Sequence, residues 1–214
     1  MSDHPDTLIA ALVDDLRPAA PLYQSRGMAY AVLALLAGAA LVTGILGMRP
    51  DFAAGRPAAL PVIAAGIFLV LALSSASAAI AMARPAVGAR RDGWGWTALM
   101  AAVLPAGALF LAVQDGMSGL VQAFAPAGLY CLALGSAASV LSAAALIIWL
   151  RRGAPSSPPR AGLLVGVAAG SAGVFATSLW CQHDGLPHIG IWHGLTVIVG
   201  GIAGRTLLPR LLAW

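Results

Sequence analysis

The sequence has very little charge: it contains no lysine and no glutamate, and only 9% of its 214 residues are ionisable Asp or Arg. An ordinary soluble domain carries about 25% charged residues, so this chain has too few to cover a surface that faces water. Hydrophobic residues make up 60% of the chain. The scarcity of charge therefore excludes a soluble globular domain and predicts an integral membrane protein.

Six apolar runs in the sequence are long enough to cross a bilayer, which takes about 20 residues of α-helix. Short segments rich in Gly, Pro, Asp or Ser separate most of them, and these residues favour turns. The runs are Met28–Gly47, Leu60–Ala83, Trp94–Val113, Ala127–Leu150, Ala161–Trp180 and Ile189–Leu208. The expected fold is all-α: a polytopic membrane protein with a bundle of six transmembrane helices and a short cytoplasmic N-terminal amphipathic helix.

Three further features of the chain refine this expectation. The break after the third run, QDGMSGLVQAFAP, is longer and half apolar, so we expect a short segment at the membrane interface there. Small residues four apart, such as Gly166 and Gly170 or Gly200 and Gly204, predict close packing between helices. The spans carry no charged residue near mid-membrane, where a transporter usually places one.

The positions of the arginines predict the orientation of the bundle. Ten of the twelve fall before the first run, between the second and third, between the fourth and fifth, or in the last turns, whereas the opposite side holds only Arg49 and Arg56. Cytoplasmic loops of membrane proteins carry the excess of basic residues. Both termini are therefore expected on the cytoplasmic side of a bacterial inner membrane. The net charge of +4 thus reflects topology, and no basic face with interleaved aromatics indicates nucleic-acid binding.

Reactive side chains are as scarce as charge, and they lie together. Cys131 is near the start of the fourth run, and Cys181 directly follows the fifth, so both are expected at the outer face. The stretch SLWCQHDGLPHIGIWHG also holds three of the four histidines. The two cysteines are the candidate reactive residues of this cluster. The candidate metal ligands beside them are His183, Asp184, His188 and His193.

The pattern leaves the chemistry of this cluster open. Sulfur and imidazole suit thiophilic ions such as Cu(I) and Zn, so a transient metal ion at Cys131 and Cys181 is one interpretation, with no permanent cofactor. A structural or reversible disulfide is the other, because disulfides persist in the periplasm. Trp180 and Trp192 are expected at the membrane interface. The chain has no C-x-x-C pair, Ser-His-Asp set or paired carboxylates, so we do not expect an enzyme.

The segment Asp6–Leu22 predicts a short amphipathic helix ahead of the first run, which Pro18 ends. Its polar face is acidic, whereas a helix that lies on anionic lipid carries Lys or Arg there. We therefore favour docking into a protein groove, with packing on the bundle's own inner loops as the alternative. The apolar stripe consists of Leu8, Ile9, Leu12, Val13 and Leu16.

Taken together, these residues resemble a known family, the six-span membrane anti-sigma factors of the NrsF type. These proteins hold extracytoplasmic-function sigma factors inactive at the bacterial inner membrane. The resemblance rests on the head run LIAALVDDLRPAAPL, on the six spans and on a cysteine at the start of the fourth span. Further matching features are Cys181, the pair Trp192–His193, and the tail residues Arg210 and Trp214.

The resemblance implies a signalling protein. Residues 1–27 would form a cytoplasmic sigma-binding segment and residues 28–214 a six-helix transmembrane sensor domain. The outward cysteines would sense heavy metal or oxidants, and the head would then release its partner, an extracytoplasmic-function sigma factor. We consider a metal or small-molecule transporter as the alternative, and a redox enzyme as a third hypothesis. The candidate sigma contacts are Leu8, Leu12, Asp15, Leu16 and Arg17.

Overall fold

The computed structural model describes residues 5–14, 21–83 and 94–212. Within these ranges the chain contains no strand, and six of its helices are long and apolar enough to cross a membrane. The expected all-α bundle with six spans is therefore confirmed. The long helices are α2 (Gln24–Leu46), α4 (Ala59–Met82), α5 (Trp94–Gln114), α7 (Ala127–Leu150), α8 (Pro158–Ser178) and α10 (Gly194–Leu212).

Short helices occupy the connections. The half-apolar segment after the third span contains the helix α6 (Gly116–Ala123). The sixth span begins earlier than expected, because a short helix and a π-helical turn precede α10 and together extend it from Leu186. The short elements are α1 (Pro5–Asp14), α3 (Pro50–Ala53), α6, α9 (Leu186–His188) and the π-helix Ile189–His193.

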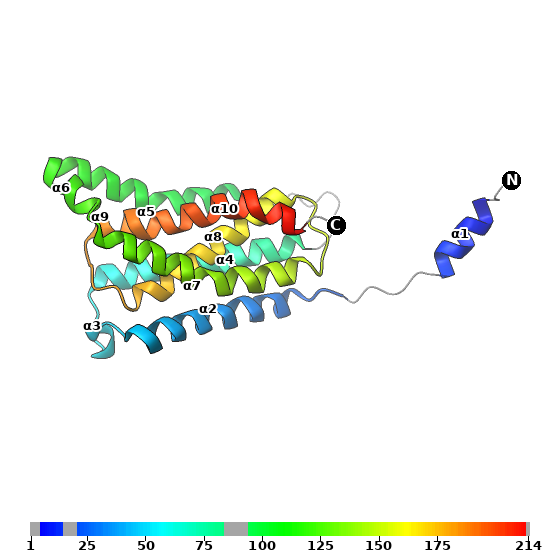
Figure 1. The fold of residues 1–214 in the computed structure, drawn as a ribbon, viewed down its shortest axis with the longest axis horizontal. Helices are drawn as coiled ribbons and strands as arrows, with labels where there is room; N and C mark the ends of the chain where they lie inside the picture. Colours follow the sequence, from blue (N-terminus) through cyan, green and yellow to red (C-terminus); the bar gives the residue numbers. More distant parts are fainter. Residues whose placement is uncertain (1–4, 15–20, 84–93, 213–214) are drawn as a thin grey trace.

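The bundle has two distinct ends (Figure 1). The connections α3, α6 and α9 gather at one end, and the start of α2 and the C terminus lie at the other. This arrangement follows from six antiparallel spans joined by short connections. The loops that the arginine distribution groups on one face thus share one end of the bundle, which we call the loop end.

The centre of the bundle is α8, whose most apolar stretch is 89% buried inside the protein. It packs against α4, α7 and α10. Glycine permits these contacts, because small residues let helix backbones approach closely in a membrane. A Cβ atom at Gly166 would overlap the carbonyl of Gly200, and one at Gly162 would overlap that of Gly204. The expected small-residue packing therefore joins α8 to α10.

The N-terminal helix α1 lies away from the bundle (Figure 1). Among its described side chains, Ile9, Leu12 and Val13 are 57%, 61% and 59% exposed. The three described residues of the expected apolar stripe are thus exposed. Leu8 lies within the helix. The remaining candidate sigma contacts, Asp15, Leu16 and Arg17, lie outside the described residues.

Candidate functional site

The two cysteines meet at the loop end of the bundle. Cys131 lies in the second turn of α7, and Cys181 follows the end of α8. Their Sγ atoms are 3.5 Å apart, although the residues are separated by 50 positions in the sequence. Both are free thiols and are only 3% and 2% exposed. The two cysteines that the sequence places at the same face are therefore in direct contact.

A π-helical turn brings two histidines to this thiol pair. In an α-helix, five residues turn through about 500°, so His188 and His193 would point about 140° apart. A π-helix forms i→i+5 hydrogen bonds, and the turn Ile189–His193 therefore places these two residues on the same side. Their ring centroids are 5.5 Å apart. Nε2 of His188 lies 3.6 Å from Sγ of Cys181.

Four of the candidate residues form one compact group. One ligand atom from each of Cys131, Cys181, His188 and His193 lies within 4.8 Å of the other three, and all four residues are buried. The group combines two thiols with two imidazoles, a donor set that suits thiophilic metal ions. We call these four residues the thiol–imidazole cluster.

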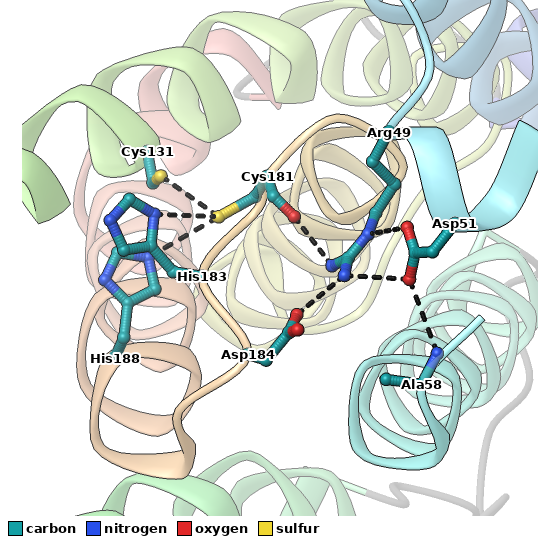
Figure 2. A network of polar contacts seen from close by, with 8 residues as sticks. All are labelled: Arg49, Asp51, Ala58, Cys131, Cys181, His183, Asp184 and His188. Atoms are coloured by element: carbon teal, nitrogen blue, oxygen red, sulfur yellow. Dashed lines mark hydrogen bonds and ion pairs between the residues drawn. The ribbon is translucent and has the colours of Figure 1, made fainter.

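The other two candidate ligands lie beside this cluster. His183 stacks on His188, with ring centroids 4.4 Å apart and an interplanar angle of 16°. Its Nδ1 lies 3.8 Å from Sγ of Cys181 (Figure 2). Asp184 instead faces Arg49, whose Nη2 donates a hydrogen bond of 2.6 Å to its carboxylate. The structure thus brings the histidines to the thiols and turns Asp184 away toward an arginine.

Arg49, the residue before α3, contacts the loop that begins at Cys181 from the side opposite the cluster (Figure 2). Its Nη1 donates to the carbonyl oxygen of Cys181 at 2.7 Å. Its Nε and Nη2 donate to the two carboxylate oxygens of Asp51 at 2.6 and 2.9 Å. Asp184 is a third partner, so the buried guanidinium donates hydrogen bonds to one backbone carbonyl and to two carboxylates. We call Arg49, Asp51 and Asp184 the arginine clamp.

The charges of the clamp stabilise one another. Burial by itself would lower the pKa of Arg49, but hydrogen bonds and attraction from Asp51 and Asp184 outweigh it, so the pKa is raised. The hydrogen bond from Arg49 is the largest cause that lowers the pKa of Asp51. Both groups are therefore ionised at neutral pH.

The thiol of Cys181 is in an activating environment. Hydrogen bonding from the Cys131 thiol lowers the pKa of Cys181, burial opposes this effect, and His188 lowers the pKa further. The thiolate is the form that binds metal ions and reacts with oxidants. The arrangement can therefore support either metal binding or oxidation of the pair.

Two hollows border the cluster. The larger, of about 330 Å³, reaches Cys131 and His183 and is walled by Tyr130 and Trp180, whose rings are 5.6 Å apart. The smaller, of about 10 Å³, lies between Arg49, Cys181, His183 and His193. The buried thiols are thus reached from a pocket rather than from a flat surface.

Comparison with protein families identifies the class of this chain. The family NrsF, described as negative regulator of sigma F, matches residues 12–214. The chain belongs to the NrsF family. Comparisons with curated proteins and with solved structures gave no match. The membership confirms the resemblance seen in the sequence and makes this protein a negative regulator of a sigma factor, within a regulatory family.

Two features of this NrsF member were missed in the sequence. Arg49 was interpreted only as a marker of topology, although its position beside Asp51 on the arginine-poor face hinted at an ion pair. Trp192 was expected at the membrane interface, but it is buried, and its Nε1 donates to the carbonyl of Ala123 in α6 at 2.8 Å. Trp192 therefore fastens α6 to the π-helix, a tertiary contact that a local sequence pattern does not reveal.

Proposed function

We propose that this protein is an anti-sigma factor of the bacterial inner membrane. It sequesters an extracytoplasmic-function sigma factor through its cytoplasmic N-terminal helix, and it releases that factor when periplasmic cysteines sense heavy metal or oxidative stress. Family membership supports the negative regulation of a sigma factor. The observation that carries the proposal is the separation of an uncovered apolar helix, α1, from a buried thiol pair at the loop end.

The N-terminal helix α1 supports the proposed capture of a sigma factor. A ten-residue helix is marginal in water by itself, so α1 gains stability when its apolar face is buried. Ile9, Leu12 and Val13 form such a face, which fits a hydrophobic groove on a protein partner. The proposed sigma contacts are Leu8, Leu12, Asp15, Leu16 and Arg17.

The thiol pair supports the sensing step. With 3.5 Å between the two Sγ atoms, a small movement allows an oxidant to form a disulfide, with loss of two protons and two electrons to that oxidant. A thiophilic ion would bind to the same two sulfurs. Either event changes the spacing of Cys131 and Cys181 and so moves α7 relative to the end of α8.

A continuous path supports the connection between the two ends. The N-terminal segment leads into α2, and Arg49, just after that helix, is hydrogen-bonded to the carbonyl of Cys181. A shift of the loop at Cys181 therefore acts on α2, the helix that directly follows the N-terminal segment in the chain.

The test is a capture experiment on full-length protein solubilised gently from its native membrane. We expect a sigma factor to co-purify, and to be lost when residues 1–22 are removed. A Leu12→Asp variant should lose it too, whereas Ala10→Asp, with the same added charge on the other face of α1, should keep it. No sigma factor with the full-length protein would contradict the proposal. Metal flux through reconstituted vesicles would favour the transporter alternative.

A further inference from the structure

We propose that Cys131, Cys181, His188 and His193 together bind one divalent thiophilic cation of the Zn²⁺ or Cd²⁺ type in a four-coordinate site. The role of this site in signalling rests on the proposed function. That proposal assigns sensing to the two cysteines alone and does not choose between a metal ion and an oxidant as the signal. As a binding site it rests on the geometry of the cluster. Here the two histidines are ligands, and His183 and Asp184 are not.

The spacing of the cluster fits tetrahedral coordination. With metal–sulfur bonds of about 2.3 Å and metal–nitrogen bonds of about 2.0 Å, a tetrahedron separates two sulfurs by about 3.8 Å and sulfur from nitrogen by about 3.5 Å. The Sγ atoms of Cys131 and Cys181 are 3.5 Å apart, and Cys181 Sγ is 3.6 Å from His188 Nε2. All four ligand atoms lie within 4.8 Å of one another. An ion at their centre requires only small side-chain adjustments.

His193 provides an independent indication of a ligand. Its side chain is 2% exposed, yet neither ring nitrogen has a hydrogen-bond partner among the described residues. A buried polar group without a partner costs about 1–3 kcal/mol, and such groups are rare in folded proteins. Coordination to a metal ion gives one of these nitrogens a partner. The π-helix is the local distortion that aims this ring at the thiols.

The charge of the cluster favours a divalent ion. On binding, each thiol releases its proton to water, so two thiolates and two neutral imidazoles surround the ion. With a divalent cation the complex is neutral, which suits a buried site, whereas Cu⁺ would leave one net negative charge. The adjacent arginine clamp has one positive and two negative groups and is itself net negative, so it would not balance that charge.

The larger pocket offers the route of entry. It opens onto Cys131 and onto His183, which covers the face of His188. His183 approaches Cys181 but is not one of the four residues of the thiol–imidazole cluster. We therefore assign His183 to the entrance of the site and expect it to affect access rather than coordination.

The test is titration of the reduced, detergent-solubilised full-length protein with Co²⁺ alone, followed by displacement with Cd²⁺. We expect one ion per chain, thiolate charge-transfer bands and d–d bands of tetrahedral intensity. His188→Ala and His193→Ala should each weaken Co²⁺ binding by about 10-fold or more, as should Ser in place of either cysteine. The matched control is His183→Ala, which should leave the affinity and the d–d bands nearly unchanged.

A substitution in this buried site can also disrupt the fold, so the wild-type protein provides a second readout. The ¹¹³Cd NMR shift of its Cd²⁺ complex should indicate two sulfur and two nitrogen ligands. Unchanged binding in His193→Ala, a shift typical of sulfur and oxygen ligands, or a Cu⁺ complex without a Co²⁺ or Cd²⁺ complex would overturn the proposal. This assay contains no sigma factor. Failure of ion binding would thus leave sigma capture intact as a separate result, and failure of sigma capture would leave the metal site standing.

Discussion

The guanidinium of Arg49 donates a hydrogen bond of 2.7 Å to the backbone carbonyl of Cys181, across 132 positions of sequence. The backbone N–H of Arg49 also donates to the carbonyl of Leu179 at 3.0 Å, so side chain and main chain both fasten the segment after α2 to the end of α8. This contact links the segment after the first span to the backbone of Cys181.

Removing the clamp should destabilise the loop end and weaken signalling. Arg49→Met leaves the Cys181 carbonyl without its donor and separates two carboxylates from their partner. We expect a loss of about 2 kcal/mol, because hydrogen bonds to charged groups contribute about that much each and Asp184 is partly solvated. Thermal unfolding in detergent measures the loss.

The matched control for this change is Arg56→Met, on the same arginine-poor face but exposed. Its stability should stay close to that of the wild type. Arg49→Lys should fall between the two, because lysine keeps the charge but lacks the planar fork that binds two acceptors. Equal stability of the Arg49 and Arg56 variants would show that the clamp does not hold the loop.

Loss of either thiol should separate sensing from capture. In Cys131→Ser and Cys181→Ser the proposed sensor is missing one sulfur, whereas α1 is unchanged at a distance from it. We expect sigma capture to persist and the transcriptional response to heavy metal or oxidant to be lost. A full response in both Ser variants would refute the assignment of these cysteines.

Metal binding and oxidation should compete for the same sulfurs. Mild oxidation of the metal-free protein should form an intramolecular disulfide between Cys131 and Cys181, lowering the mass by two hydrogens, because the Sγ atoms are already 3.5 Å apart. Prior loading with Cd²⁺ should slow this reaction, since thiolates bound to metal are poorer nucleophiles. Mass spectrometry of intact protein measures both. Equal oxidation rates with and without Cd²⁺ would show that the ion binds elsewhere.

Mild acidification should leave the clamp intact. The pKa of Asp51 is lowered by Arg49, so its stabilising effect is present above the unfolded value of about 3.9 and is lost only as the pH falls through the lower folded value. The difference in unfolding temperature between wild type and Asp51→Asn should therefore stay constant from about pH 7 to about pH 5. A difference that shrinks within this window would mean that Asp51 titrates there and is not held by Arg49.

The sequence predicts the spans well because a membrane imposes a simple rule of length and apolarity. The limits of α7, for example, agree fully with its apolar run. The cluster was harder to predict, because α-helical geometry keeps His188 and His193 apart, and a π-helix cannot be read from IGIWH. Arg49 was harder still. Its partner is a carbonyl group, which every residue carries, so no pattern of side chains marks the contact.

Close packing at the centre of the bundle gives a final prediction about the fold. Gly166 of α8 faces the carbonyl of Gly200 in α10 so closely that a Cβ atom would overlap it. Gly166→Ala should therefore push the helices apart, at a cost of about 1–3 kcal/mol, the usual penalty for overpacking. The control is Gly44→Ala in α2, where a Cβ would meet no atom within 4 Å and alanine favours the helix. Because α10 continues from the π-helix that carries His193, we also expect weaker Co²⁺ binding in Gly166→Ala alone. If both variants unfold at the wild-type temperature, the glycine contact does not set the spacing of α8 and α10.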